Sequence, residues 1–598
     1  MSADFHVSNT VGKVVQLTGN LANVARLATA NLADDPQYFA LQATRRFAGS
    51  RRLHGLRKLS AKAGGRAGFA RTAALLGEDS AQLREILESQ RNHWTKPRQA
   101  ARLADSAIAA GLWQTAHAIL DAGGSSSHTA RTAARLHWSL GNLDEAVSKL
   151  DTAKGFGGRQ LAHYRSELSV LNGWEPTIHA HPRDWSTSGQ PRVLYVATNS
   201  LPYTGSGYAQ RTHSLLTALQ VDGVEAWCAT RVGYPLSIGH LAARKEELVQ
   251  SVDYRRLLPA RLCFDAAGRI QQQTELLAQL VTELRPSVLH TTTDFTNALA
   301  VRAVARAFDL PWVYEVRGQL IDTWASTRPA ASGASQRYRL FAAREAELAA
   351  SADAVLTLGE AMRENLQRTG TQPERITVLP NGVGEDYLRA DLHDDDHARK
   401  SARIAVGLEP EALYWGTVSS LVDYEGLDLL VRVTARLAPE HPKLRLLIVG
   451  DGVQREPLMR LAAELGVADR CRFPGRVPRR NAPTYHAALD VFAVPRRDLA
   501  VTRAVTPLKQ VEAMASGVPV MASNLPALAE LVKDRVNGLL IDPSDTGAWT
   551  ESLEKLMVDP SLRSRLGRSG RKFVSENRTW SSCSSKLQRI YSSLAMAN

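Results

Sequence analysis

Short apolar runs alternate with longer amphipathic stretches over most of this chain, from Val193 to Ile541. A continuous apolar run of four to eight residues is typical of a strand buried on both faces, and each stretch that follows is long enough for a helix. The runs include VLYVAT, PSVLHTTT, PWVYEV, AVLTLG, ITVLP, ALYWGTV, LRLLIVG, CRFPG, LDVFAVP, VPVMAS and GLLID. This alternation predicts an α/β protein built of parallel sheets covered by helices.

The α/β part is interrupted once. The segment LHDDDHARKSARIAVGLEPE, at 392–411, is charged and poor in apolar residues between two strand signals. A chain of 598 residues is also too long for a single core. We therefore expect two Rossmann-like halves, residues 190–395 and 405–575, which face a cleft where the carboxyl ends of their strands converge. A C-terminal helix is expected over 576–598.

Residues 80–175 show a different pattern, in which helix follows helix. The stretches ARLADSAIAAGLWQTAHAILDAG and AARLHWSLGNLDEAVSKLDTAKG align as two helical hairpins, each with an alanine at the helix contact. The second copy, from Leu136 through Gly141, Glu145 and Ala146, resembles a tetratricopeptide unit, which predicts an all-α helical-repeat region and a surface for a protein partner. An ordinary helical domain that packs on the rest of the chain is the alternative.

The N-terminal segment, residues 1–79, is expected to be partly helical and partly disordered. Its residues 41–77 form a basic block with nine arginines and lysines and no acid. The block fits a solvated helical face, a nucleic-acid footprint or attachment to anionic lipid headgroups. Apolar residues such as Phe47 and Leu53 interleave at near-helical spacing, which favours a lipid surface over nucleic acid.

Composition limits the class of protein and its location. Hydrophobic residues make up 44% of the chain and charged residues 22%, which is ordinary for a globular protein. No run approaches the ~18 to 20 apolar residues of a membrane span, and no signal peptide is recognisable. The four cysteines lack C-x-x-C spacing, so neither a zinc site nor a disulfide framework is expected. We expect a cytoplasmic protein, attached peripherally to the inner face of the membrane where the basic block binds lipid.

The stretch AVTPLKQVEAMASGVPVMAS, at 504–523, places two opposite charges at the start of a helix between two predicted strands. The helix is expected to begin near Pro507, so that the N–H groups around Leu508 and Lys509 point into the cleft and attract an anion. Glu512 lies three residues further along, near the same face. A surface ion pair between Lys509 and Glu512 is the alternative interpretation.

Polar residues also follow the predicted strands of the first half. Gly205 and Gly207, in PYTGSGYAQRTH, would allow a tight turn and close approach of the backbone to a ligand. Arg211 and His213 follow on the next helix, where they face either the cleft or the surface.

Charged residues at strand ends are either cleft residues or solvated strand exits. His290 ends one strand and Asp294 lies in the loop after it, while Glu315 and Arg317 end another. Because ligands in such sheets bind beyond the strand carboxyl ends, we expect contacts to acceptor or sugar here.

Several of these stretches together resemble one enzyme family. The runs KQVEAMASGVPVMAS, LRLLIVGDGVQREPL, ADRCRFPGRVPRRNAPTYHAALDVFAVP and VLPNGV look like the nucleotide-sugar domain of the family-4 retaining glycosyltransferases (glycosyltransferase group 1) of the GT-B fold. NSLPYTGSGYAQRTHSLLTAL, TRVGYP, PWVYEVRG, LGEAM, GTVSSLVDYEGLDLL and TPLK match one branch of that family. The resemblance covers roughly residues 190–580.

The resemblance implies an activity and a set of roles. It implies a retaining, hexosyltransferase-like enzyme that moves a sugar from a UDP- or GDP-sugar to a glycan or lipid-linked acceptor in cell-envelope or exopolysaccharide synthesis. Glu512 would bind the ribose hydroxyls and Lys509 the diphosphate. The implied catalytic residues are Lys509, Glu512, Arg317 and Glu315. The implied donor-binding residues are Gly205, Gly207, Gly450, Arg476, Val477, Arg496, Arg503, Pro507, Leu508, Lys509 and Glu512. The implied acceptor-binding residues are Arg211, His213, His290 and Asp294, with Asn381 and Gly382 on the hinge side of the cleft.

The chain departs from the family pattern at three positions. A first glutamate, eight residues before the second in many members, is here Ala504, and an arginine and a lysine of the second domain are replaced by Ser420 and Glu425. The positive charge for the diphosphate must then come from other residues. The candidates are Arg496, Arg497, Arg503 and Lys509. These changes indicate a rerouted site, with a degenerate, non-catalytic copy as the alternative.

No cofactor or metal is expected, because fixed cations and a helix N-terminus can stabilise the leaving diphosphate. The acidic run at Asp394–Asp396 fits a solvated linker better than a metal site. Two other functions remain open. The chain could be a scaffold that binds partners through its helical repeats and senses a ligand through a degenerate site. A phosphorylase of similar architecture would need a pyridoxal-phosphate lysine, for which no motif is seen.

Overall fold

The computed structural model describes most of the chain. The described residues are 16–29, 71, 80–153, 157–180, 182–186, 189–388 and 396–597. Nearly all of the basic block at 41–77 lies outside them, as do Asp394 and Asp395, so the predictions made for these residues stay predictions. No helix among the described residues combines the length and the apolar character needed to cross a bilayer.

Residues 16–29 form a helix that docks on the first α/β domain through amide side chains. Asn20 donates to the carbonyls of Leu241, at 2.8 Å, and Ala243, at 3.1 Å. Asn23 donates to the carbonyl of Pro259 and accepts from the N–H of Leu262, both at 2.9 Å. The N-terminal segment is therefore partly helical, as expected.

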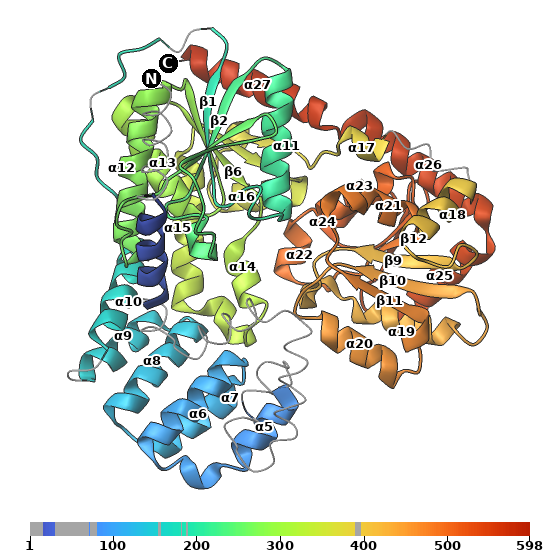
Figure 1. Ribbon diagram of the computed structural model, residues 1–598, viewed down its shortest axis with the longest axis horizontal. Helices are drawn as coiled ribbons and strands as arrows, with labels where there is room; N and C mark the ends of the chain where they lie inside the picture. The colour runs from blue at the N-terminus through green and yellow to red at the C-terminus, as the bar shows by residue number, and fades with distance from the viewer. Residues whose placement is uncertain are drawn as a thin grey trace, which may run out of the picture.

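The described residues between Ser80 and Leu171 are mostly helical and sit below the first α/β domain in Figure 1. Their helices are α5 (Ser80–Glu88), α6 (Pro97–Ala109), α7 (Trp113–Gly123), α8 (Ser127–Leu140), α9 (Leu143–Thr152) and α10 (Gly158–Leu171). The two predicted hairpins are α6–α7 and α8–α9. Ala116 and Ala146, the predicted contact alanines, are fully buried. The helical hairpins are confirmed, and the likeness to tetratricopeptide units stays a prediction.

The first α/β domain has an eight-stranded sheet in the order β3-β4-β2-β1-β5-β6-β7-β8, parallel except for β3. Its strands are β1 (Arg192–Ala197), β2 (Glu225–Thr230), β3 (Glu246–Val249), β4 (Val252–Arg256), β5 (Val288–Thr292), β6 (Trp312–Val316), β7 (Ala354–Thr357) and β8 (Ile376–Val378). Its main helices are α11 (Gly207–Val221), α12 (Ala266–Leu284), α13 (Phe295–Phe308), α14 (Leu320–Ala325), α15 (Gln336–Ser351) and α16 (Glu360–Arg368).

Strands β2, β3 and β4 have no counterpart among the predicted apolar runs. They lie toward one edge of the sheet, and β3 pairs antiparallel with β4. The outer strands β3 and β4, EELV and VDYRR, carry charges because they keep one side in contact with water, whereas β2, EAWCAT, lies further inside the sheet and is mostly buried. A search for continuous apolar runs therefore finds the centre of the sheet and misses this edge.

The second α/β domain has a six-stranded parallel sheet in the order β11-β10-β9-β12-β13-β14. The strands are β9 (Leu413–Val418), β10 (Leu444–Val449), β11 (Cys471–Gly475), β12 (Val491–Val494), β13 (Val520–Ser523) and β14 (Leu539–Ile541). The helices are α19 (Asp428–Leu437), α20 (Arg455–Glu464), α21 (Ala482–Ala487), α22 (Ala500–Ala504), α23 (Leu508–Ala515), α24 (Pro526–Ala529), α25 (Thr546–Val558) and α26 (Pro560–Asn577). Helices α17 (Glu385–Leu388) and α18 (Asp396–Ala405) lie between the domains in sequence.

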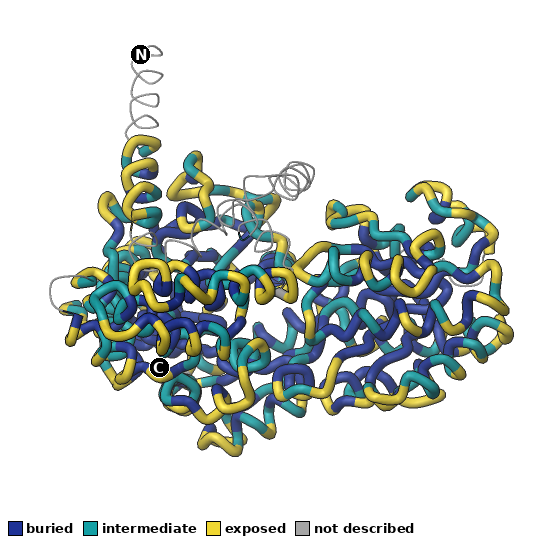
Figure 2. Tube along the Cα trace, turned by 90° about the horizontal axis from the view of Figure 1, so that it is seen from below, coloured by how far each residue is buried: buried dark blue, intermediate teal, exposed yellow. Residues whose placement is uncertain are grey.

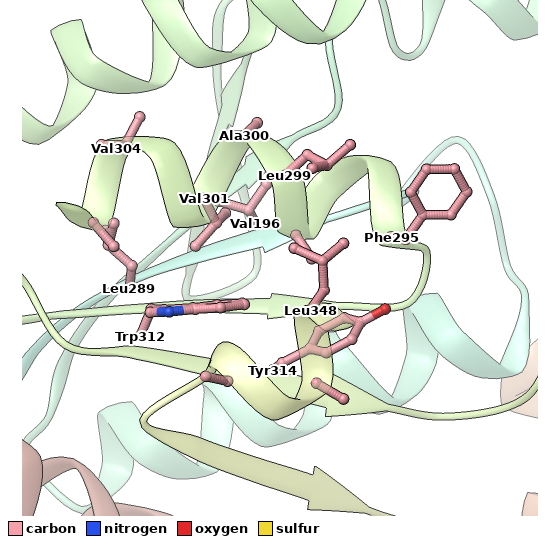
Figure 3. Packing of buried hydrophobic residues seen from close by; sticks show 14 of the residues in the cluster. Val196, Leu289, Phe295, Leu299, Ala300, Val301, Val304, Trp312, Tyr314 and Leu348 are labelled. Carbon is pink, nitrogen blue, oxygen red and sulfur yellow. The ribbon is translucent and has the colours of Figure 1, made fainter. Parts of the chain in front are cut away.

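Each α/β domain has its own interior. Figure 3 shows the packing in the first domain, where Leu299 and Val301 of α13 contact a core that includes Leu289 of β5 and Trp312 of β6. Figure 2 shows buried residues concentrated inside both α/β domains. The second domain buries two clusters, one on each face of its sheet. The predicted pair of Rossmann-like domains is confirmed.

The last helix, α27 (Trp580–Ala597), returns from the second domain to the first, as the red helix in Figure 1 shows. Its residues Trp580, Leu587 and Tyr591 join the core that α11 forms with β1. All four cysteines are free, in line with the absence of a predicted disulfide framework.

Candidate active site

The site is built where the strand order of each sheet reverses. This point lies between β1 and β5 in the first domain and between β9 and β12 in the second. In open parallel sheets, ligands bind beyond the carboxyl ends of the strands at this point. The loops after β9 and β12 carry Glu425 and Arg496, which form an ion pair across it.

Glu425, Arg496 and Lys509 form a compact group that we call the donor-side cluster. Arg496 Nε lies 3.3 Å from Oε2 of Glu425, and Nη2 lies 3.1 Å from Oε1. Lys509 Nζ donates to Oε2 of the same carboxylate. The remaining amino group of Arg496 donates to the carbonyl of Val505 at 2.7 Å. Two cations thus share one carboxylate, which leaves the cluster with one positive charge in excess.

Burial and mutual attraction set the charge states of this cluster. Burial alone would raise the pKa of Glu425, but Arg496 and Lys509 lower it to about 2. Burial and the nearby Arg496 lower the pKa of Lys509 to about 8, although Glu425 opposes this shift. At neutral pH both cations are present, and Lys509 loses its proton as the pH rises through about 8.

Glu512 lies on the same helix as Lys509 but contacts other groups. Its Oε1 is 3.2 Å from Nη1 of Arg479, and its Oε2 is 3.9 Å from Nε2 of His486. Burial raises the pKa of Glu512, an effect that Arg479 opposes. Burial and Arg479 lower the pKa of His486 to about 3, so its ring is neutral. Among the described residues no ion pair joins Lys509 to Glu512, so the surface-pair interpretation is wrong.

Helix α23 begins near Pro507, as predicted. Leu508 is its first residue, and Pro507 is the N-cap rather than the first helical residue. Leu508 packs against the core that α27 shares with the first domain. The start of α23 therefore lies at the contact between the two domains, as predicted, with Lys509 beside it.

Of the four candidate cations, only Arg496 and Lys509 join the donor-side cluster. Arg503 pairs with Asp498 on the surface, where its side chain is 56% exposed. Arg497 donates to the carbonyl of Asp423 at 3.0 Å and pairs with Asp428. The prediction that Arg503 binds the donor does not fit this geometry.

Three further predicted donor residues border the same carboxyl ends. A Cβ on Gly450 would lie 1.8 Å from the carbonyl oxygen of Ser419, so glycine is needed where the loops after β10 and β9 touch. Arg476 is exposed in the loop after β11, and the half-buried Val477 packs against the core under α23. None of these three positions carries a charge contact to the donor-side cluster in the described structure.

The glycine loop of the first domain lies between β1 and α11. Neither Gly205 nor Gly207 has a positive φ. The backbone at the predicted tight turn therefore does not require glycine at either position. Within the described structure no atom comes within 4 Å of a Cβ placed on Gly207, and Gly205 meets only Gln210, at 3.9 Å. Space for a ligand therefore remains beside this loop. Helix α11 begins at Gly207, and Ser206 is its N-cap, whose side chain accepts from the N–H of Ala209.

Glu315 is the centre of a fully buried polar network in the first domain. Arg211 Nε lies 2.7 Å from Oε1 of Glu315, and Arg317 Nη2 lies 2.6 Å from Oε2. Tyr195 donates to the same carboxylate at 2.7 Å, and His290 Nε2 is 3.6 Å away. Burial alone would raise the pKa of Glu315, but the two arginines hold it well below its usual range. Burial lowers the pKa of His290.

The remaining hydrogen bonds of this network run to the protein interior. Arg211 donates to the carbonyls of Leu379 and Pro380 and to Asn381. Arg317 donates to the carbonyl of Tyr208 and to Thr212. Nδ1 of His290 is hydrogen-bonded to the hydroxyl of Tyr591 in α27. The side chains of Arg211, Glu315 and Arg317 are at most 2% exposed. The predicted contacts of Glu315, Arg317, Arg211 and His290 with sugar or acceptor therefore do not fit. Sequence reasoning placed these charges at strand ends but could not show that they satisfy one another.

The other two predicted acceptor residues also have internal partners. His213 lies between the hydroxyl of Tyr254, at 3.0 Å from Nδ1, and Gln250, at 2.6 Å from Nε2. Asp294 is the N-cap of α13 and accepts from the N–H of Thr296 at 3.0 Å. Asp294 remains partly exposed at the carboxyl end of β5. Both ring nitrogens of His213, in contrast, have hydrogen-bond partners near the edge of the sheet.

Several residues that the sequence did not single out join the two domains. A Cβ on Gly318 would lie 2.7 Å from the hydroxyl of Tyr208 and 3.4 Å from Val505, so Gly318 lies beside Tyr208 of α11 and Val505 of the second domain without room for a side chain. Glu530 of the second domain accepts from the N–H groups of Glu360 and Ala361, at 2.9 and 2.8 Å, and so caps α16 of the first. In the sequence, Tyr208 is marked only by an ordinary Gly-x-Gly-Tyr motif, and Glu530 is an acidic residue at the end of a helix.

The predicted hinge residues lie at the same contact. Asn381 donates to the carbonyl of Thr506 at 3.0 Å. A Cβ on Gly382 would lie 2.8 Å from the Trp580 ring of α27, so this position has no room for a side chain. Ala504, in place of the family's first glutamate, packs against the apolar core of the first domain. An acid at this position would be buried among apolar groups.

A possible metal-ligand group lies elsewhere. Ligand atoms of Glu440, His441 and Glu554 lie within 4.8 Å of one another. Residues 440 and 441 precede β10, so the group lies at the opposite end of the sheet from the donor-side cluster. It has no part in the candidate active site.

The fold and the arrangement of its domains define a class. Two Rossmann-like domains whose strand carboxyl ends border a shared contact, with a C-terminal helix that returns to the first, make up the GT-B fold. Residues 206–382 match the family model of the glycosyl transferase 4-like domain, and residues 399–573 match that of glycosyl transferases group 1. The chain thus carries both glycosyltransferase domains, one after the other.

Curated relatives and solved structures agree with these matches. The chain is 34% identical over 216 residues to the GDP-mannose-dependent alpha-(1-6)-phosphatidylinositol monomannoside mannosyltransferase of Mycolicibacterium smegmatis, which covers 36% of this chain and 55% of the relative. It is 32% identical over 255 residues to the D-inositol 3-phosphate glycosyltransferase of Xylanimonas cellulosilytica, 41% of this chain and 58% of the relative. The chain spans little more than half the length of these relatives.

The fold likeness extends over a larger part of the chain. A sucrose-phosphate synthase from Thermosynechococcus elongatus superposes with a TM-score of 0.57 at 20% identity and covers 68% of this chain and 100% of its own. At this identity the likeness shows the fold alone. The covered share leaves room for an additional region, which fits the helices before β1.

Proposed function

We propose that this protein is a retaining glycosyltransferase that moves a sugar from a UDP- or GDP-sugar to a glycan or lipid-linked acceptor in cell-envelope or exopolysaccharide synthesis. The observation that carries the proposal is the donor-side cluster. Glu425, Arg496 and Lys509 place two cations beside the start of α23, at the point where the strand order reverses. Nucleotide diphosphates bind at such points in related folds.

The hard step in such a transfer is departure of the nucleoside diphosphate from the anomeric carbon. Negative charge then develops on the leaving oxygen, and fixed positive groups aimed at it lower the barrier. Arg496 and Lys509 are suited to this task because Arg496 is buried and the side chain of Lys509 is only 11% exposed, so their charges act more strongly than in water. The start of α23 adds its unpaired N–H groups.

Glu512 is suited to hold the ribose. Its carboxylate lies one helical turn beyond Lys509, and its Oε1 accepts no hydrogen bond from the described residues despite the nearby Arg479. A carboxylate can accept two hydrogen bonds from a cis-diol. The separate surroundings of Lys509 and Glu512 fit two different parts of one nucleotide.

The acceptor is expected to bind on the side of the first domain. The open space beside Gly205 and Gly207, together with the partly exposed Asp294, is the place we assign to it. The two curated relatives are named for a phosphatidylinositol mannoside and an inositol phosphate, which favours a polyol or lipid-linked acceptor here. A lipid acceptor also fits the basic block at 41–77 as a means of peripheral attachment to the inner face of the membrane. A vesicle-sedimentation assay that shows equal binding to anionic and neutral lipid would remove this attachment from the proposal.

A thermal-shift panel of UDP- and GDP-sugars tests the function. We expect one donor to raise the melting temperature, and slow hydrolysis of that donor by the purified protein even without its acceptor. Stabilisation by a donor without any turnover, with or without candidate acceptors, would favour the scaffold or sensor interpretation instead.

A further inference from the structure

Glu425 is a carboxylate in direct contact with both cations that are proposed to hold an anion. Its side chain is 5% exposed and accepts hydrogen bonds from both Arg496 and Lys509. A carboxylate in a diphosphate site repels the ligand unless it does something else there. Its position therefore needs an explanation.

The geometry gives one. Arg496 comes from the loop after β12, Lys509 from α23, and Glu425 from the loop after β9, so three separate segments meet at one carboxylate. Without it, two like charges would face each other in a buried space, and Lys509 in particular has a flexible stem and no other hydrogen-bond partner among the described residues. The two-point contact with Arg496 fixes the carboxylate and hence the ammonium group.

We propose that Glu425 is a positioning residue of the donor site, which holds Arg496 and Lys509 side by side and keeps Lys509 protonated so that both can bind the diphosphate. The proposal rests on the function proposed above. Glu425 itself stays ionised throughout the working range of pH, because its cationic neighbours lower its pKa to about 2. The excess positive charge of the cluster remains for the ligand.

Few charged groups act on Lys509, so the effect of Glu425 on its pKa can be measured separately from other effects. Glu425 and Arg496 are the charged groups that act on it. The charges on the helices packed around α23 face its other end: Asp386 of α17 and His486 of α21 act on Glu512, and Arg571 of α26 donates to the carbonyl of Ala515. Removing the charge of Glu425 leaves Lys509 beside a cation alone, which lowers its pKa further.

The test measures the affinity for GDP and for UDP by isothermal titration calorimetry with purified protein, at pH values from 6 to 9.5. Wild-type affinity should fall as the pH rises through about 8, where Lys509 loses its proton. Glu425→Gln keeps the shape and should weaken binding by about tenfold or more at pH 8 and move the midpoint of the pH dependence to lower pH. Lys509→Arg should remove the loss of binding at high pH, and Glu425→Gln with Lys509→Arg should remove the shift caused by Glu425→Gln, because arginine stays charged.

Glu411→Gln is the matched control. Glu411 pairs with Lys400 at 2.8 Å on the surface, with its side chain 70% exposed, so its loss should leave the pH midpoint unchanged. Should Glu425→Gln fail to fold, Glu425→Asp keeps the charge with a shorter reach and should give weaker binding with a smaller shift of the midpoint.

The outcomes separate the two proposals. Wild-type protein that binds a nucleoside diphosphate, with a midpoint that none of the Glu425 variants moves, would overturn the role of Glu425 and leave the proposed function standing. Wild-type protein that binds neither GDP nor UDP at any pH would overturn both.

Discussion

In each α/β domain a buried glutamate lies between two cations, and the two groups differ in how many further hydrogen bonds the cations make. In the first domain Glu315 binds Arg211 and Arg317, and both arginines also donate to backbone carbonyls or hydroxyls of the interior. In the second domain Glu425 binds Arg496 and Lys509, and Lys509 has no further partner among the described residues. The same three charges thus make a closed network in one domain and an open one in the other.

Exposure follows the same division. The side chains of Arg211, Glu315 and Arg317 are 0 to 2% exposed, whereas Lys509 is 11% exposed at the start of α23. The Glu315 network holds the fold together, because losing one member leaves the others unpaired, although Nε of Arg317 and Nε2 of His290 have no hydrogen-bond partner among the described residues. A network with a donor to spare can exchange a partner for a ligand. The comparison teaches that the cluster suited to a ligand is the one in which a cation is partly exposed and has a single partner among the described residues, as Lys509 does.

The largest effect should come from breaking the closed network. Glu315→Ala leaves two arginines buried without their carboxylate and should lower the free energy of unfolding by about 3 to 5 kcal/mol. Urea unfolding followed by circular dichroism measures it. Glu411→Ala, which removes an exposed partner of Lys400, should cost at most about 1 kcal/mol. A loss of similar size for both variants would contradict the structural role of Glu315.

Lys509→Ala should lower activity strongly and stability only a little. We expect turnover of the nucleotide sugar to fall by about tenfold or more, equivalent to about 1.4 kcal/mol or more, because one diphosphate cation is lost. The melting temperature should fall by less than in Glu315→Ala. Initial rates with the donor from the thermal-shift panel measure the first quantity; wild-type turnover in Lys509→Ala would remove its assigned role.

Glu512→Ala tests which part of the donor Glu512 binds. It should weaken binding of the nucleoside diphosphate by about tenfold, since the ribose loses its acceptor, but leave the affinity for inorganic pyrophosphate nearly unchanged. Lys509→Ala should weaken both. Competition titrations with the two ligands measure this, and equal losses of both in Glu512→Ala would mean that Glu512 does not contact the ribose.

The smallest effect is expected at the interdomain cap of α16. Glu530→Ala removes the carboxylate that accepts from the N–H groups of Glu360 and Ala361 and should cost about 1 kcal/mol, the usual value for a lost helix cap. Glu530→Gln, which keeps one acceptor oxygen, should lose less. Thermal unfolding of the three proteins compares them; an alanine variant as stable as wild type would show that the cap contributes nothing to the stability of the contact.

The fold could be predicted from the sequence to a large extent, and the site only in outline. Apolar runs such as VLYVAT and LRLLIVG identify central strands because both of their faces are buried, while the charged β3 and β4 at the sheet edge carry no such signal. Lys509, Arg496 and Glu512 could be found because they follow strand ends in one contiguous stretch.

The errors have a common physical cause. Arg317 and Arg496 both follow a strand of their sheet, and only the contacts across the fold show that one is enclosed by Tyr195 and Glu315 while the other joins Glu425 and Val505. Glu425 looked like the loss of a cation, and its pairing with Lys509 depends on residues 84 positions apart in the chain. Sequence spacing cannot report which partners satisfy a charge.

The most direct test of the central claim is a crystal structure of the wild-type protein with GDP or UDP bound. The account predicts that diphosphate oxygens lie within hydrogen-bond distance of Lys509 and Arg496, with the ribose hydroxyls on Glu512. A diphosphate bound elsewhere, with Lys509 still held by Glu425 and turned from the nucleotide, would contradict it.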